Sequence, residues 1–187
     1  MRSLPVSRVL GTLKGSMDAR GSAVAPTGGA HQATTANGYT TPLPRNVRQV
    51  RVRMHHTDLV GAVYHGTFFD LFEDARTEVF RALGYTYRDC VEGEGRLMII
   101  VRAACDYKRP ARMDDELAIA VTVEALTRVR LGFAYAVSLA ATGESVAFGQ
   151  QVFAFLDPRT NRPTSVPPRL AALVRATPEF AAPTGKA

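Results

Sequence analysis

Apolar residues in segment 67–83 recur at the spacing of one helical face, and charged residues fill the positions between them. The positions on this face are Phe68, Phe72, Ala75, Val79 and Leu83. Gly84 follows directly and is typical of the residue that ends a helix. The spacing predicts an amphipathic helix over residues 67–83, about 25 Å long and able to cross a sheet.

Five other segments have the alternating pattern or the apolar, β-branched composition of strands. The first precedes the helix, where Val50, Val52 and Met54 alternate with arginines. The other four follow the helix, at residues 97–107, 116–126, 130–141 and 144–157. One long helix against an antiparallel sheet is an α+β arrangement. We therefore predict a five-stranded antiparallel sheet with one long helix, and a short final helix at 167–176, within a single domain over residues 46–177.

Two of the predicted strands are apolar on both faces. Large side chains fill one face of 116–126 and 130–141, whereas the other face carries only small residues, among them Ala118, Ala120, Ala134 and Ala136. A sheet face exposed to water normally carries polar residues. We expect the helix to cover one face and a partner subunit the other, in a homo-oligomer with more than one edge-to-edge contact, a dimer of dimers or homotetramer.

Charge is distributed unevenly along the 187 residues, whose net charge is +6. Residues 1–50 hold six basic side chains and one acid, and the remainder holds 17 basic and 16 acidic. The folded part is therefore nearly neutral, which argues against nucleic-acid binding. The isolated cysteines Cys90 and Cys105 indicate a reducing compartment, so we predict a cytoplasmic protein. The longest apolar run, Leu97–Val101, is too short to span a membrane.

The chain ends differ from the domain in composition. Residues 15–45 are rich in Gly, Ala, Ser, Thr and Pro without a hydrophobic period, and the first fourteen are basic and mildly amphipathic. We expect a tail over 1–45 that is disordered or directs organelle import, because its start resembles a transit peptide. A non-functional extension is the alternative. Residues 178–187 are predicted to be frayed.

The chemistry is concentrated just before the long helix. Asp58 lies in a polar turn, and Tyr64-His65-Gly66 leads directly into the helix, whose first N–H groups lack partners and favour negative charge. A carboxylate facing amide donors that stabilise an oxyanion is suited to acyl transfer. A simple turn aspartate is the alternative interpretation of Asp58.

The segment HHTDLVGAVYHGTFFDLFEDARTEVF, supported by YKRPARMDDEL and FLDPRTNRP, resembles the hot-dog fold proteins of the 4-hydroxybenzoyl-CoA thioesterase family. Within that family it resembles the bacterial acyl-CoA thioesterases associated with the Tol–Pal envelope system. The resemblance covers residues 47–170 and implies a hot-dog fold, with the sheet wrapped around the central helix. It also implies hydrolysis of an acyl-CoA or acyl-carrier-protein thioester without a cofactor.

The family motif has a glycine three positions after its aspartate and Tyr-His six and seven positions after it. Asp58, Gly61, Tyr64 and His65 match. The resemblance implies that Asp58 is the catalytic carboxylate, as nucleophile or as general base. It implies that the N–H groups of His65 and Gly66 polarise the thioester carbonyl, with Tyr64 beside them. The His65 side chain would orient the substrate or donate to Asp58, unless it only satisfies loop carbonyls.

The chain departs from these relatives at two positions in the motif. They carry a tyrosine four residues before the aspartate and often an acid two residues before it. Met54 and His56 occupy these positions here. The departure puts the polar contact of that tyrosine, and the acyl preference, in question.

Glu73 is the alternative carboxylate. Other hot-dog thioesterases carry their acid on the central helix, and hot-dog hydratases or dehydratases pair a helix acid with a histidine, here Glu73 with His65. The competing expectation is an ordinary ion pair between Glu73 and Arg76, three positions apart. A non-catalytic acyl-binding module is the third hypothesis.

The cluster Lys108, Arg109 and Arg112 is suited to the phosphates of coenzyme A, or else forms surface ion pairs in a turn. We predict no metal site. His55, His56, Asp58 and His65 lack a ligand pattern, because adjacent His55 and His56 should point to opposite sides of an extended segment.

Overall fold

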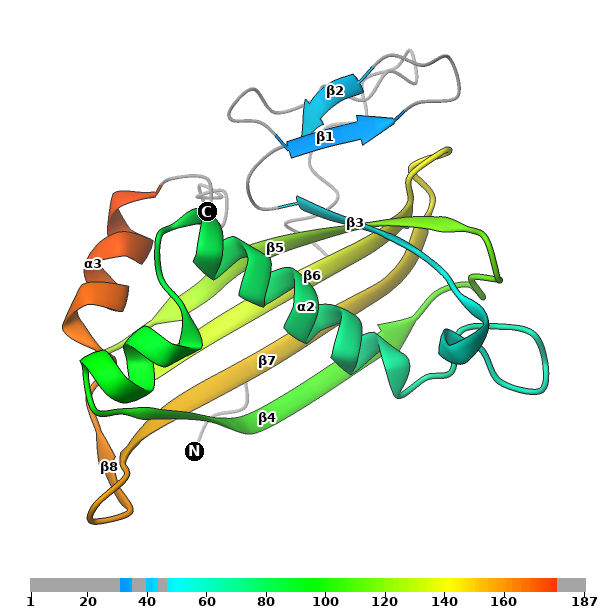
Figure 1. Ribbon diagram of the computed structural model, residues 1–187. Coiled ribbons are helices and arrows are strands. Elements are labelled where there is room, and N and C mark those ends of the chain that lie inside the picture. The colour runs from blue at the N-terminus through cyan, green and yellow to red at the C-terminus, as the bar shows by residue number, and fades with distance from the viewer. Residues whose placement is uncertain (1–30, 35–39, 44–46, 178–187) are drawn as a thin grey trace, which may run out of the picture.

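A curled antiparallel sheet wraps around one long helix in the computed structural model, which describes residues 31–34, 40–43 and 47–177 (Figure 1). The five main strands lie in the order β3-β5-β6-β7-β4. Their bounds are β3 (Val47–Arg51), β4 (Leu97–Tyr107), β5 (Glu116–Leu126), β6 (Arg130–Leu139) and β7 (Ser145–Asp157). The predicted α+β hot-dog architecture is confirmed.

Helix α2 (Thr67–Ala82) lies across the inner face of the sheet (Figure 1). It begins at the predicted residue and ends one residue before the predicted end. Gly84, two residues after Ala82, has a φ of 71°, a conformation that favours glycine. Its buried face comprises Phe68, Leu71, Phe72, Ala75, Arg76, Val79 and Phe80. The sheet supplies the predicted large residues, including Leu117, Ile119, Leu131, Phe133 and Tyr135, each at most 1% exposed. Burial of these apolar faces against each other is the main stabilising contribution.

Phe72 is the central contact between the two layers. Its ring stacks on Tyr135 at 4.4 Å between centroids, and it lies directly above Gly149 of β7. A Cβ built on Gly149 would come within 2.3 Å of the Phe72 ring. The absence of a side chain at Gly149 therefore lets the helix approach β7.

Several short elements were not predicted from the sequence. Strand β8 (Arg162–Thr164) pairs with β7 beyond the end of β6, and η2 (Asp89–Gly93) is a single π-helical turn. In the tail expected to lack regular structure, β1 (His31–Thr34) pairs antiparallel with β2 (Thr40–Leu43). The rest of the tail, including its transit-like start, and residues 178–187 lie outside the described residues.

The C-terminal helix α3 (Pro168–Ala176) is attached to the segment after α2 through Arg169. The Arg169 guanidinium donates to the Gly84 carbonyl at 2.7 Å and pairs with Asp89 at 3.2 Å. The Arg169 backbone N–H donates to Glu94, which also accepts from the Tyr85 hydroxyl. These contacts fix the position of segment 84–94 relative to the end of the sheet. No described helix has both the length and the apolar character needed to cross a bilayer.

We expect Gly149→Ala to lower the free energy of unfolding by about 1–3 kcal/mol, because the added methyl group overpacks the core against Phe72. Urea denaturation measures the change. Gly93→Ala is the matched control, since a Cβ there meets no atom within 4 Å. Equal stability of the two variants would contradict the packing argument.

Candidate active site

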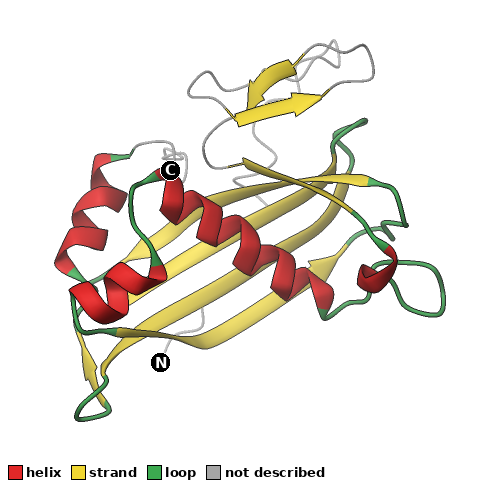
Figure 2. Ribbon diagram, in the orientation of Figure 1, coloured by secondary structure: helices red, strands yellow, loops and turns green. Residues whose placement is uncertain are grey.

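The loop between β3 and α2 begins with one 3-10 turn, η1 (Met54–His56), and continues as a small hairpin. Thr57 and Val63 form a β-bridge, and the Asp58 N–H donates to the Ala62 carbonyl at 2.9 Å. Gly61, with φ of 73°, closes the turn by donating its N–H to the Asp58 carbonyl. Figure 2 shows this loop reaching beyond the end of the sheet.

Asp58 is half-buried within this hairpin and stabilises the turn. Its Oδ1 accepts the Val60 N–H at 2.9 Å, an Asx turn of the kind considered for this aspartate from the sequence. No partner is found for its second carboxylate oxygen among the described residues. Leu59 and Val60 at the tip are almost fully exposed. The carboxylate is thus held by one oxygen, next to an apolar tip that a partner or ligand could cover.

The start of α2 leaves backbone donors unused. The Thr67 N–H donates to the Tyr64 carbonyl, and the Tyr64 N–H donates to the His56 carbonyl, both at 2.9 Å. In the described part of the chain, the N–H groups of His65 and Gly66 donate no hydrogen bond. Two unpaired donors at a helix N-terminus are suited to binding an oxyanion.

Two tyrosines set the geometry of this helix start. The Tyr64 ring covers Gly66 so closely that a Cβ there would lie 2.7 Å from Tyr64 Cε1. Tyr107, at the end of β4, donates its hydroxyl to the His65 carbonyl at 3.0 Å, and burial raises its pKa to about 12. A role for Tyr107 was not predicted from the sequence, although this residue opens the YKRPARMDDEL segment. Nothing in its local pattern links it to His65, which is distant along the chain.

His56 occupies the position where the relatives often have an acid. Its Nδ1 accepts the Arg53 N–H at 3.1 Å, so Nδ1 is unprotonated. Burial lowers the pKa of His56, helped by the nearby charges of His55 and Arg53 and opposed by Asp74 and Asp70. The folded loop therefore favours the neutral form of the His56 ring.

The predicted basic cluster is divided in space. Arg112 lies beside the Asp58 hairpin: it forms a β-bridge with Ala62, and its Nη1 is 3.9 Å from where a Cβ on Gly61 would lie. Arg109 instead pairs with Glu144, and the Lys108 ammonium lies 6.0 Å from the centre of the Phe148 ring. Arg112 alone among the three is shown next to the hairpin.

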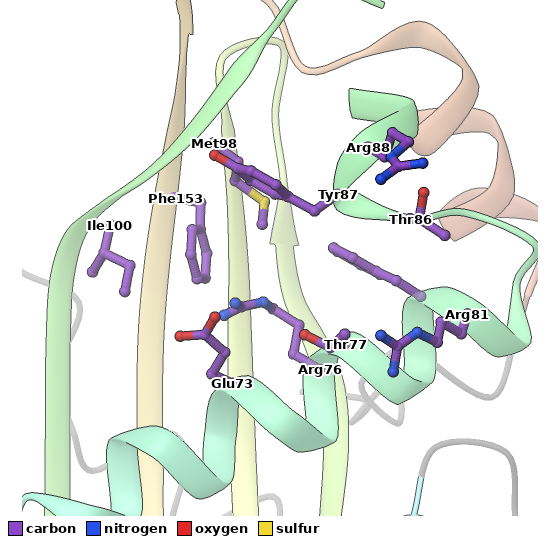
Figure 3. A pocket seen from close by; sticks show the side chains of 11 residues that line it. Glu73, Arg76, Thr77, Arg81, Thr86, Tyr87, Arg88, Met98, Ile100 and Phe153 are labelled. Atoms are coloured by element: carbon purple, nitrogen blue, oxygen red, sulfur yellow. The ribbon is translucent and has the colours of Figure 1, made fainter. Parts of the chain in front are cut away.

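The expected ion pair between Glu73 and Arg76 is absent from the ion pairs of the described residues, so that expectation is wrong. Arg76 lies on the buried face of α2, and its side chain points toward the sheet instead of along the helix surface. Both residues line a cavity of about 410 Å³ between α2, β4, β7 and segment 86–88 (Figure 3). Asp58 and His65 do not line this cavity.

The histidines of the loop are arranged differently from the expectation. His55 and His56 lie in the 3-10 turn and not in an extended segment, and their ring centroids are 4.1 Å apart. Even so, no group of three or more His, Cys, Asp or Glu side chains in the described residues converges as metal ligands would.

The sequence profile of the thioesterase-like superfamily matches residues 52–174, which contain the hairpin, α2 and the whole sheet after β3. The chain belongs to this superfamily. The resemblance to hot-dog thioesterases drawn from segment 55–80 is therefore confirmed.

Individual members of the family are similar over different lengths. A candidate esterase of Synechocystis is 34% identical over 109 residues, which cover 58% of this chain and 65% of that protein. The acyl-CoA thioester hydrolase YbgC of Escherichia coli is 26% identical over 123 residues, covering 66% of this chain and 90% of the relative. The chain thus spans just under two thirds of the Synechocystis protein.

Among solved structures, the 1,4-dihydroxy-2-naphthoyl-CoA thioesterase of Synechocystis superposes with a TM-score of 0.66. The superposition covers 69% of this chain and 94% of that enzyme, at 18% identity. At this identity the likeness is one of fold.

We expect His56→Gln to reduce the pH dependence of stability. The folded state favours the neutral ring, so the unfolded state binds more protons as the pH falls through 6.5. In the wild type the free energy of unfolding should therefore decrease from about pH 7.5 to about pH 5.5. Urea denaturation across this range measures both proteins. Parallel profiles would contradict the assignment.

Proposed function

We propose that the protein hydrolyses the thioester of an acyl-CoA or an acyl-carrier protein, with Asp58 as the attacking or water-activating carboxylate. The observation that carries the proposal is the pair of unused N–H groups at His65 and Gly66, close in the chain to the Asp58 hairpin. Membership of the thioesterase-like superfamily and the name of the Escherichia coli relative support it.

Each group has a defined part in the proposed reaction. The carbonyl oxygen of the thioester would accept the N–H groups of His65 and Gly66, which stabilise the negative charge that develops there. Asp58 would attack the carbonyl carbon and expel the thiolate, and water would then hydrolyse the resulting mixed anhydride to the free acid and the Asp58 carboxylate. Alternatively, Asp58 would remove a proton from water that attacks the carbonyl carbon, and the thiolate would leave as the free acid forms. Tyr107 would act as a positioning residue, because it holds the His65 carbonyl and so the peptide that carries the Gly66 N–H.

The substrate's polar end has a candidate partner in Arg112, beside the hairpin. A guanidinium at this edge is suited to a phosphate of coenzyme A. Lys108 contacts Phe148 and Arg109 pairs with Glu144, which favours a structural role for both residues.

A second candidate is a hydrolase in which Glu73 is the carboxylate. The observation that favours it is that Glu73 lines the 410 Å³ cavity, whereas Asp58 does not. A hydratase that uses His65 with Glu73 of the same chain is less favoured. The two residues are eight positions apart, and the helix rises about 9 Å from Thr67 to Glu73.

We propose that the protein acts as a homo-oligomer, with a dimer of dimers as the expected form. Among the described strands, β4 has no neighbour on its outer side, and it exposes Ile99, Ile100 and Val101. An exposed apolar edge is suited to pairing with a second copy. The outer sheet face is lined by half-buried small residues such as Ala118, Ala134 and Ala136, as a second contact requires.

Asp58→Asn is expected to lower kcat by a factor of about 100 to 10,000, the usual range for a lost acid–base group. The asparagine oxygen can still accept the Val60 N–H, so the hairpin should stay folded. Release of free thiol from a panel of acyl-CoAs measures the rate. Asp157→Asn is the matched control, because Asp157 makes a similar turn with Arg159 away from the hairpin.

Glu73→Gln separates the two candidates in the same assay. It should change the rate less than Asp58→Asn if Asp58 is the catalyst. A larger loss in Glu73→Gln would transfer the role to the helix, and near-normal turnover of Asp58→Asn would overturn the proposal.

For the oligomer, Val101→Lys should lower the molar mass seen by light scattering, because β4 then carries a charge at its apolar edge. Thr142→Lys, on an exposed turn, is the control. A wild-type monomer at micromolar concentration, or an unchanged mass for Val101→Lys, would contradict an interface at this edge.

A further inference from the structure

Arg76 is the only buried charged side chain in the described part of the protein, with 6% of its surface exposed. It lies on α2 and points into the cavity described above, between Glu73 and Phe153 (Figure 3). Its guanidinium carbon lies 4.5 Å from the centre of the Phe153 ring. A buried charge is unfavourable unless an anion and further hydrogen bonds compensate for the lost water.

The contacts of Arg76 do not provide that compensation. Its Nη1 donates to Gln151 Oε1 at 3.2 Å, and its buried Nε has no acceptor. No carboxylate oxygen among the described residues lies within 4.0 Å of the guanidinium. Gln151 Oε1 is shared with the Tyr135 hydroxyl at 2.8 Å, and burial raises the pKa of Tyr135, so both neighbours are neutral.

Two other charged residues of the cavity, Arg81 and Arg88, form ion pairs at its rim. Arg81 pairs with Glu78, and Arg88 pairs with Glu92 at 3.7 Å. Glu73, three positions earlier on the same helix, is solvent-exposed and forms no ion pair with Arg76. The rim charges therefore leave the guanidinium of Arg76 as the one cation without an acid partner in this cavity, as far as the described residues show.

The remaining walls are largely apolar. Phe80, Met98, Ile100 and Phe153 line the cavity, whose volume of about 410 Å³ lies in the range of small-molecule sites. An occupant with an apolar body and an anionic end would match both the walls and the unpaired cation. A planar guanidinium can bind a carboxylate through two parallel hydrogen bonds, so a carboxylate is the anionic group that matches Arg76 best.

We propose that Arg76 binds a carboxylate at the far end of the acyl group, so that the preferred substrates are thioesters of dicarboxylic acids. This inference rests on the proposed thioester hydrolysis. The helix rises about 14 Å from Thr67, near the proposed oxyanion donors, to Arg76. Arg76 is therefore a specificity residue, distant from the bond that breaks.

The phosphates of coenzyme A share the anionic chemistry but fit the position less well. Arg76 is buried against an aromatic ring, whereas Arg112 stands at the exposed hairpin. A phosphate dianion keeps more water than a carboxylate and would favour the exposed arginine. Comparison of a carboxylate-ended and a methyl-ended analogue that share the coenzyme A phosphates separates the two sources of negative charge.

The test uses non-hydrolysable thioether analogues of acyl-CoA in matched pairs. One member ends in a carboxylate, as in adipyl, suberyl or sebacyl chains, and the other ends in a methyl group. Calorimetry should find the carboxylate analogue of the best length bound about 10- to 100-fold more tightly by the wild type. Arg76→Met should abolish this preference and leave the methyl analogue bound as before.

Two further variants control for charge and folding. Arg175→Met removes an exposed arginine from α3 and should retain the preference. Arg76→Lys keeps the charge but loses the planar fork, so it should show a reduced preference even if Arg76→Met fails to fold. The melting temperature of Arg76→Met without ligand should be unchanged or higher, because an uncompensated buried charge is removed.

Three outcomes would overturn the inference. The first is a wild type with no preference for the carboxylate. The second is an equal loss of affinity for both analogues in Arg76→Met, which would indicate that Arg76 binds a phosphate of coenzyme A. The third is dissociation of the oligomer in Arg76→Met, which would assign its counter-charge to a second protomer.

Failure of the proposed function would look different. If the wild type hydrolyses methyl-ended acyl-CoAs without preferring dicarboxylic ones, the proposed function holds and the inference about Arg76 is wrong. If the wild type binds the carboxylate analogues through Arg76 but releases no thiol from any acyl-CoA, the binding site holds and the proposed hydrolase activity is wrong.

Discussion

The burial of α2 against the curled sheet is the constraint on which the other features depend. Phe72 is enclosed between Tyr135 and the bare backbone of Gly149, which fixes the depth of the helix above β7. The same contact fixes where the helix begins, and so where the N–H groups of His65 and Gly66 point. A single packing arrangement therefore sets both the core and the orientation of the proposed oxyanion donors.

The start of the helix is held from a second side by β4. Tyr107 packs its ring against Phe68 at 5.4 Å between centroids and donates its hydroxyl to the His65 carbonyl. One side chain thus joins the sheet edge, the core and the turn before α2. Because β4 is also the exposed edge of the sheet, a displacement of that edge would be transmitted through Tyr107 to the proposed oxyanion donors.

Most of the fold could be predicted because its signal is periodic. The apolar faces of α2, β5 and β6 follow their helix and strand periods, and the structure buries them as expected. Strand β8 has only three residues, one of which is Pro163, and it follows the turn at Asn161, so no period could reveal it. The Asp58 motif was recognisable by its spacing, whereas Tyr107 depends on a tertiary contact that local sequence does not encode.

Arg76 illustrates the limit of helical patterns most clearly. It stands four positions after Phe72 and next to Ala75, so its place on the apolar face was already visible. A charged residue in the sequence is normally assigned to the solvent side, and its spacing from Glu73 supported that choice. Only the position of Gln151 on the facing strand, with its amide oxygen turned inward, explains why the arginine points to the interior.

The attachment of α3 through Arg169 has a consequence for the shape of the cavity. One guanidinium connects the last helix to the Gly84 carbonyl and to Asp89, on either side of Thr86, Tyr87 and Arg88, which form one wall of that cavity. Loosening the C-terminal helix would therefore widen a space built by residues from the middle of the chain. Helix α3 therefore helps to set the width of the cavity that we propose holds the acyl group.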